Sequence, residues 1–255
     1  MTAKKAGART SAPLNQKSKK ATVSKTVTKT SKTANSKATN GAAPDAKPSA
    51  VCGFVSFVGS GPGEPELLTV RAVDLLRQAE VVVTEAPGHA ALVAQLAPGA
   101  EVVDGGFGTD GQPLTHAGRA KVVVKQAKSG RRVVRLMAGD PFVYASGPEE
   151  AQACVKAGVA FEIVPGVSSV TAVPAYAGVP LTDKKHREIA VVNCSEAKID
   201  WAAYADDRTL VLLSAVGAIG EVSKALIAAG RAPGTPVAMT RVGTTTEQET
   251  VVSTL

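Results

Sequence analysis

The residues best suited to binding a ligand come directly after the first predicted strand. They run from Gly59 to Pro65, with the sequence GSGPGEP, and lead into the first predicted helix. Glycines permit positive φ and a close approach of the backbone, as a ligand loop at the carboxyl end of a strand requires. A dinucleotide fingerprint would need glycine where Glu64 stands, and Pro62 removes an amide donor, so a pyrophosphate cradle is disfavoured. A tight strand-to-helix turn would account for the glycines equally well.

Further segments of this kind follow later predicted strands. In RLMAGDPF, Asp140 can accept hydrogen bonds from ligand hydroxyls beside Gly139, although a capping aspartate in an ordinary loop fits the same residues. In VPGVSS, Ser168 and Ser169 can cap the next helix or contact a ligand, and YAGVPLT follows that helix. The sequence thus places candidate ligand loops after several strands.

Short β-branched runs alternate with amphipathic stretches from Phe54 onward. This alternation predicts an α/β fold, and a body rich in Val, Ala and Leu but poor in aromatics suits a parallel sheet buried on both faces. The predicted strands are Phe54–Val58, Val81–Thr84, Glu101–Asp104, Arg132–Leu136, Ala160–Val164, Ile189–Cys194, Leu210–Ser214, Pro236–Thr240 and Thr250–Thr254. The predicted helices are Glu66–Gln78, Ala90–Leu96, Ala117–Lys128, Glu149–Ala157, Ser168–Ala177 and Glu221–Ala229.

The charge of the chain is concentrated in residues 1–50. They hold 11 of the 29 Lys and Arg residues and one of the 22 Asp and Glu residues, which leaves 18 basic and 21 acidic groups in the remainder. A body so close to neutral lacks the clustered charge of a nucleic-acid interface, so no specific nucleic-acid partner is expected. With almost no large apolar residues, this basic tail is predicted to be disordered, either as a solvated lysine-rich tail or as an organelle-targeting segment.

The composition also predicts no transmembrane helix and favours a reducing compartment. No apolar run approaches the roughly 20 residues that a spanning helix needs. Cys52, Cys154 and Cys194 are widely spaced and form no CxxC pair. They are interpreted as ordinary thiols of a cytoplasmic protein rather than as disulfides or metal ligands, and no metal is expected.

Taken in order, GSGPGEPELLT, RLMAGDPF, EIVPGVSS and YAGVPLT resemble the tetrapyrrole methylases, and TLVLLSA and GTTTEQETVVSTL extend the resemblance over about residues 53–255. After the basic tail (1–50), which its composition predicts to be disordered, the resemblance implies two αβα domains (51–165 and 166–255) with S-adenosyl-L-methionine in the cleft between them. It implies a homodimeric C-methyltransferase acting on uroporphyrinogen-III, or on a later precorrin, towards siroheme and cobalamin. The last predicted strand stops at Leu255 without a closing element, which leaves open that the chain is a fragment.

The resemblance also assigns site residues. The catalytic acid that the family places after its second strand corresponds to Glu85, a candidate base; an exposed acid at a strand end is the alternative. A substrate rich in carboxylates needs cations, for which Arg71, Arg135 and the basic run 184–187 are candidates, although 184–187 could equally be a solvated loop. His116 is expected to be a helix-start or surface residue. The cofactor contacts fall on Pro62, Ala138, Gly139, Asp140, Val143, Ser168, Ser169, Ser214 and Gly243.

The chain departs from the family pattern at several polar positions. Met137 and Gly106 replace lysines, Ser146 replaces an arginine, and Ser214 replaces a methionine that usually contacts the cofactor. The cofactor frame is therefore better preserved than the catalytic set. The departures leave one alternative, a weakly active or non-catalytic methylase-like domain associated with uroporphyrinogen-III synthase. The basic tail leaves another, a binding module that the tail tethers to an anionic surface.

Overall fold

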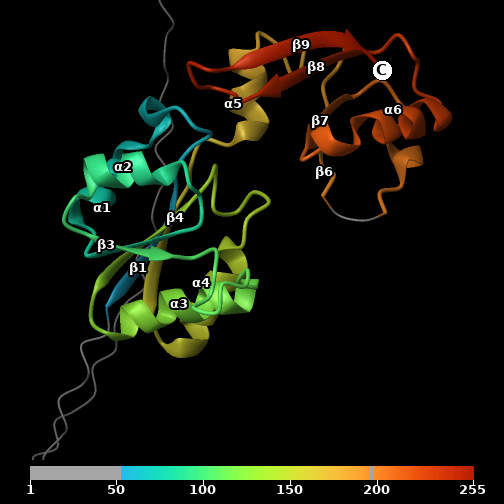
Figure 1. Ribbon diagram of the computed structural model, residues 1–255. Coiled ribbons are helices and arrows are strands. Elements are labelled where there is room, and N and C mark those ends of the chain that lie inside the picture. Colours follow the sequence, from blue (N-terminus) through green and yellow to red (C-terminus); the bar gives the residue numbers. More distant parts are fainter. Residues whose placement is uncertain (1–52, 196–197) are drawn as a thin grey trace, which may run out of the picture. The chain divides into compact units, whose positions relative to one another are not determined.

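The computed structural model describes residues 53–195 and 198–255 (Figure 1). The tail 1–50, for which disorder is predicted, and Cys52 lie outside the described residues. No helix within the described ranges is long and apolar enough to cross a membrane.

A five-stranded, all-parallel sheet confirms the predicted α/β fold. Its strands follow the order β3-β2-β4-β1-β5, with β1 pairing with both β4 and β5. Val-rich runs form its centre, where β1, β2 and β4 are almost entirely buried. The strands are β1 (Phe54–Gly59), β2 (Val81–Thr84), β3 (Glu101–Asp104), β4 (Arg132–Met137) and β5 (Ala160–Val164).

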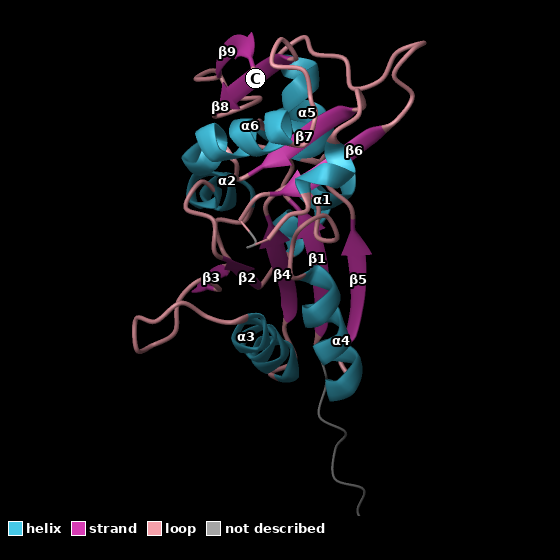
Figure 2. Cartoon of the chain, turned by 90° about the vertical axis from the view of Figure 1, so that its right-hand side faces the viewer, coloured by secondary structure: helices cyan, strands magenta, loops and turns pink. Residues whose placement is uncertain are grey.

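Helices cover both faces of this sheet, as Figures 1 and 2 show. Helices α1 (Val70–Gln78) and α2 (His89–Leu96) pack on one face, and α3 (His116–Lys128) and α4 (Gly147–Ala157) pack on the other. Successive residues of a strand point to opposite faces, so Phe57 enters the core under α3 and α4 while Val58 enters the core under α1 and α2.

The strand order places a topological switch point between β1 and β4. The chain leaves β1 through α1 on one face, and leaves the adjacent strand β4 through α4 on the opposite face. Neighbouring strands whose connections diverge in this way form a topological switch point, and ligands of open α/β sheets bind at the carboxyl ends of such strands. Both GSGPGEP and AGDP lie at this position.

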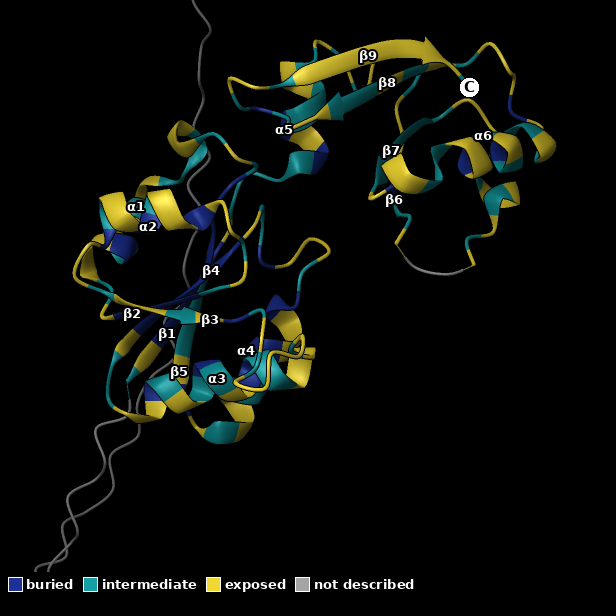
Figure 3. Ribbon diagram, in the orientation of Figure 1, coloured by how far each residue is buried: buried dark blue, intermediate teal, exposed yellow. Residues whose placement is uncertain are grey.

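The remainder of the chain forms two small ribbons and two helices. Strands β6 (Ile189–Asn193) and β7 (Thr209–Leu213) are parallel, whereas β8 (Pro236–Arg241) and β9 (Glu249–Thr254) are antiparallel. Figure 3 shows β9 exposed along its length. The helices are α5 (Ser169–Tyr176) and α6 (Ile219–Ala228), with short 3₁₀ turns η1 (Pro65–Leu67), η2 (Trp201–Tyr204) and η3 (Val216–Ala218).

The first predicted helix is split in two. Residues 68 and 69 are extended, and the Thr69 side chain caps α1 by accepting from the Ala72 amide. A threonine in this position satisfies an amide that would otherwise lack a partner in the first turn, so the helix begins after it. The other predicted helices and all the predicted strands agree with the structure to within about two residues at their ends.

Candidate functional site

The loops that follow β1, β4 and β5 are joined through four glycines, Gly59, Gly61, Gly139 and Gly166, which we call the glycine seam. The Gly61 amide donates to the Gly139 carbonyl at 3.2 Å, and the Gly139 amide donates to the Gly61 carbonyl at 2.8 Å. Directly before this pair, the Ser60 amide donates to the Met137 carbonyl at 2.8 Å. The β1 and β4 loops thus continue the pairing of their strands beyond the sheet edge.

Glycine is required within the seam for steric reasons. A Cβ on Gly166 would lie 2.0 Å from the Gly139 carbonyl oxygen, and one on Gly59 would lie 2.5 Å from the same atom. Gly139 differs, because a Cβ there would have no neighbour within 4 Å, and its φ is +65°. The seam is therefore closed on the side of Gly59 and Gly166 and open on the side of Gly139.

Asp140 fastens the seam to the β5 loop. Its Oδ1 accepts from the Phe142 amide at 2.8 Å, and its Oδ2 accepts from the Gly166 amide at 2.9 Å. Asp140 thus holds two loop amides, although it caps no helix, and direct contact with a ligand stays a prediction. Val143, on the same loop, is 40% exposed.

The hydroxyls after β5 begin helix α5. Ser168 is its N-cap and accepts from the Val170 amide at 3.2 Å, and Ser169 is the first helical residue. Both follow Gly166 within three residues, so they lie at the same sheet edge as Asp140. The capping alternative holds for Ser168, and a ligand role for either serine stays a prediction.

The two later candidates are placed differently. A Cβ on Gly243 would lie 2.6 Å from Cγ2 of Val173, so this residue packs closely on α5, and its neighbour Thr244 accepts a hydrogen bond from the Glu64 amide at 3.3 Å. Gly243 therefore borders the β1 loop. Ser214 is exposed at the end of β7 with φ +56°, and no hydrogen bond among the described residues connects it with the seam.

Glu85, the predicted base, pairs with Arg135, which is also bound to Glu150 in the core. Arg135 is fully buried, and its Nε and Nη2 donate to Glu150 at 2.8 and 3.0 Å while Nη1 pairs with Glu85. Burial alone would lower the pKa of Arg135, but its bonds to Glu150 and Glu85 outweigh burial and raise it. The Glu85 side chain stays 32% exposed, so it remains accessible from the sheet edge.

The prediction that Arg135 meets a carboxylate-rich substrate is wrong for this structure. Its guanidinium is enclosed and already satisfied by two carboxylates of the chain itself. The signal was present in the sequence, since an arginine between Val134 and Leu136 in a buried strand needs an acidic partner in the core. Glu150, one turn into α4, is that partner.

Three departures from the family pattern also lie in or against the interior. The Met137 side chain is 2% exposed and joins the core under α3 and α4. Ser146 is buried and donates to Glu150 at 2.6 Å. A Cβ on Gly106 would come within 3.2 Å of the Glu85 Cβ, so the loop after β3 lies against Glu85.

The remaining candidate cations and His116 lie on the surface. Arg71 pairs with Glu162 at 2.9 Å and lines a cavity of about 330 Å³ with Phe54 and Arg132, the first residues of β1 and β4. This cavity lies toward the opposite end of the strands from the seam. The run 184–187 is largely exposed, and His116 is the exposed first residue of α3, as expected.

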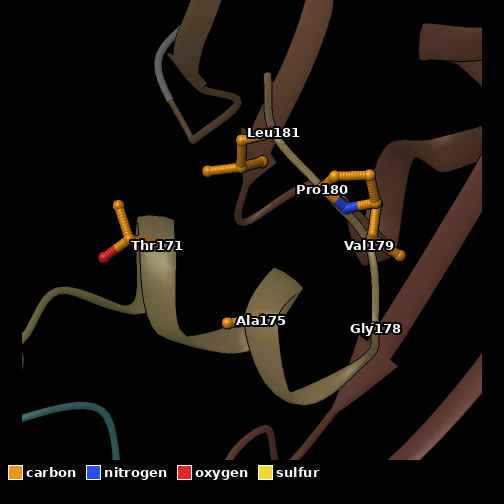
Figure 4. A pocket seen from close by; sticks show the side chains of 6 residues that line it. All are labelled: Thr171, Ala175, Gly178, Val179, Pro180 and Leu181. Carbon is orange, nitrogen blue, oxygen red and sulfur yellow. The ribbon is translucent and has the colours of Figure 1, made fainter. Parts of the chain in front are cut away.

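An open cavity of about 370 Å³ follows α5 (Figure 4). Thr171 and Ala175 of the helix line it together with Gly178, Val179, Pro180 and Leu181. The YAGVPLT motif therefore forms a wall of this hollow. Its lining contains a single side-chain hydroxyl and no charged side chain.

Comparison with known proteins gives the class of this fold and site. Residues 55–255 match the family of tetrapyrrole (corrin/porphyrin) methylases, and the chain belongs to that family. This confirms the family predicted from the ordered motifs.

Individual relatives are more specific. The chain is 38% identical over 211 residues to the S-adenosyl-L-methionine-dependent uroporphyrinogen III methyltransferase of Methanosarcina barkeri, covering 80% of this chain and 83% of that protein. It is 36% identical to the uroporphyrinogen-III C-methyltransferase of Synechocystis, covering 79% of this chain and 80% of the relative. The siroheme synthases are longer: the match to that of Acinetobacter baylyi, 36% identical, covers 80% of this chain but 46% of the relative.

A solved structure of a uroporphyrin-III C-methyltransferase is also similar to this chain. The uroporphyrin-III C-methyltransferase of Thermus thermophilus, crystallised with S-adenosylhomocysteine, has a TM-score of 0.68 and 33% identity, covering 79% of this chain and 88% of that one.

Proposed function

We propose that the chain transfers the methyl group of S-adenosyl-L-methionine to a carbon of uroporphyrinogen-III, the reaction that leads towards siroheme and cobalamin. The glycine seam at the topological switch point is the observation that supports this most strongly, because the best-preserved family motifs meet there. The relatives named for this reaction match four fifths or so of the chain. A second proposal, carried by the resemblance alone, is that the protein acts as a cytoplasmic homodimer.

The residues of the seam fit such a cofactor. The open side of Gly139 lets a ligand lie against the backbone, and Ser168 and Ser169 add hydroxyls at the same edge of the sheet. We propose that the cofactor is held by Pro62, Ala138, Gly139, Asp140, Val143, Ser168 and Ser169, with Ser214 and Gly243 contributed from the later strands.

The reaction places modest demands on the protein. The sulfonium methyl of the cofactor is already activated and a pyrrole carbon is already nucleophilic, so this chemistry requires neither a metal nor a covalent intermediate. The chain's residues must hold carbon, methyl and sulfur in line and exclude water. Glu85 is proposed to take the proton that the methylated carbon loses, because its carboxylate is partly exposed at the sheet edge and is held in place by Arg135.

Binding at the seam can be tested by calorimetry with S-adenosylhomocysteine on the full chain and on Gly139→Val. The branched side chain would occupy the space above Gly139, so affinity should fall at least tenfold. Gly158→Val is a matched control, because Gly158 has φ +67° and equally open surroundings at the far end of α4. Both variants suffer the same backbone strain. Equal affinity of the two variants would remove the seam from the cofactor site.

The base is tested by the rate of methyl transfer. Glu85→Gln preserves shape and removes basicity, so kcat should fall about tenfold or more while cofactor affinity stays unchanged. Glu80→Gln is the control, since Glu80 lies just before β2, at the opposite end of that strand from Glu85, and pairs with the exposed Arg132. Full activity of Glu85→Gln would exclude Glu85 as the base.

A non-catalytic methylase-like domain is the alternative that the departures suggest. Since Met137 and Ser146 are buried in this structure, those two replacements alter the interior rather than an exposed binding surface. This favours retained activity. Cofactor binding without any methyl transfer to uroporphyrinogen-III or to early precorrins would instead support the alternative.

A further inference from the structure

A chain of hydrogen bonds links the end of β2 with the cofactor loop through a buried histidine. His89, in the first turn of α2, is 7% exposed. Its Nδ1 meets Oγ1 of Thr84 at 2.5 Å, and its Nε2 meets Oγ of Ser60 at 2.8 Å. Ser60 is the residue between Gly59 and Gly61 of the seam, so the imidazole bridges elements that are far apart in the sequence.

The other hydrogen bonds of the Ser60 and Thr84 hydroxyls define which atom donates in each bond to the imidazole. The Ser60 hydroxyl is also placed to donate to the Gly61 carbonyl at 3.4 Å, so it accepts from Nε2–H. The Thr84 hydroxyl accepts from the Ala86 amide at 3.4 Å and donates to Nδ1. Each group donates once and accepts once when His89 is neutral and carries its proton on Nε2.

The surroundings favour this neutral form. Burial lowers the pKa of His89, and the Arg135 charge adds to the effect, while Glu85 acts in the opposite direction. An imidazolium would place a second proton against the Thr84 hydroxyl and reverse that bond.

We propose that His89 is a positioning residue for the cofactor, which holds Ser60 and thereby the open face of the seam in the geometry that binds S-adenosyl-L-methionine. The inference rests on the proposed function. Ser60 is held by its side chain to His89 and by its amide to Met137, and the next residue, Gly61, forms the reciprocal pair with Gly139. A shift of Ser60 is therefore passed directly to the carbonyl and amide of Gly139.

Two matched substitutions separate this role from simple core packing. His89→Gln keeps a donor where Nε2 meets Ser60, whereas His89→Asn reaches only the position of Nδ1 near Thr84. We expect calorimetry with S-adenosylhomocysteine to show the glutamine variant within about twofold of the wild type. The asparagine variant should bind about fivefold more weakly, the usual effect of one lost hydrogen bond.

A double-mutant cycle then tests whether the effect passes through Ser60. Ser60→Ala removes only a hydroxyl and should itself weaken binding about fivefold. Adding His89→Asn to Ser60→Ala should weaken binding less than twofold further, because the shared bond is already gone. Thermal midpoints of all variants show how far each change also affects folding.

The outcomes are distinct. Equal affinities of the glutamine and asparagine variants, or independent effects in the double mutant, would overturn the positioning role even if both variants lose thermal stability. If His89→Asn does not fold, unchanged affinity of Ser60→Ala overturns the role by itself. A wild-type chain that does not bind S-adenosylhomocysteine would instead contradict the proposed function, and this inference with it.

Discussion

Residues 53–164 and residues 189–255 bury their side chains to very different degrees. Among the largest fully buried side chains of the described residues, only Leu226 belongs to the later region. The earlier region encloses the ion pair of Arg135 and Glu150 completely, whereas the ion pair of Arg241 and Glu249 on the β8–β9 ribbon is about two thirds exposed. In the later region, Arg231 is the buried charged residue among those described.

This difference indicates which part of the chain holds the candidate site residues in fixed positions. The glycine seam, His89 and Glu85 all rest on the carboxyl edge of the five-stranded sheet, where packing on both faces fixes the loops. Gly243 and Thr244 come from the later region, although Thr244 itself is 1% exposed, and they meet the β1 loop at Gly63 and at the Glu64 amide. Substitutions of buried residues in the earlier region should therefore cost more stability than substitutions in the later region, which should leave the fold almost unchanged.

The largest expected effect comes from breaking a buried ion pair. Glu150→Gln leaves the Arg135 guanidinium without one of its two carboxylates in the core, which should lower the free energy of unfolding by about 3 kcal/mol. The matched change on the ribbon, Glu249→Gln, should cost less than about 0.5 kcal/mol because that pair is exposed to solvent. Urea denaturation of both variants makes the comparison, and similar losses would show that the two regions are equally well packed.

A smaller contrast is expected between two cysteines. Cys154 is fully buried, and burial, with Glu150 nearby, raises the pKa of its thiol to about 11. Cys194, just after β6, is only partly buried, although burial raises its pKa as well. Iodoacetamide at pH 8 should therefore alkylate Cys194 at least about tenfold faster than Cys154.

Peptide mass spectrometry gives the two alkylation rates separately. The same experiment in denaturant is the control, where the two rates should converge. Equal rates in the native protein would mean that the core under α4 opens as readily as the edge of β6.

The smallest effect concerns pH. The pKa of His89 is lowered by burial, so the unfolded chain takes up this proton at a higher pH than the folded chain does. The contribution of neutral His89 to stability is complete above about pH 6.5 and is lost as the pH falls below it towards the lowered value. His89→Gln cannot titrate, so its unfolding free energy should fall less between pH 7.5 and pH 5.5.

The two proteins share His116 and His186, and Glu85 and Arg135 face the imidazole in both, so only the contribution of His89 differs. Identical pH dependence of the wild type and His89→Gln would show that the imidazole is not held in its neutral form.

Local patterns explain why so much of the fold was predictable. The β-branched side chains in the runs VVVT and RVVRLM predict strands. The segments between the predicted strands have helical periodicity. The candidate ligand loops could be proposed from the sequence because glycine, proline and aspartate cluster directly after these strands. Capping by Thr69 was harder to recognise, since a threonine fits equally well inside a helical pattern, and the first predicted helix was therefore too long.

The side-chain partnerships could not be read from the sequence. Ser60 and His89 are 29 positions apart, and Arg135 and Glu85 come together only because β2 and β4 are neighbours in the sheet. Strand order decides these contacts, and no periodicity encodes it. For the same reason Arg135 was predicted to face the substrate, although the sheet places its guanidinium in the core.

The most direct test of the account is the transfer of labelled methyl from S-adenosyl-L-methionine to uroporphyrinogen-III by the full chain, with the product separated from free label. We expect methylated tetrapyrrole from the wild type and from Gly158→Val, and much slower transfer by Gly139→Val. Complete absence of methylated product from a wild-type protein that binds S-adenosylhomocysteine would contradict the claim that the chain is an active methyltransferase.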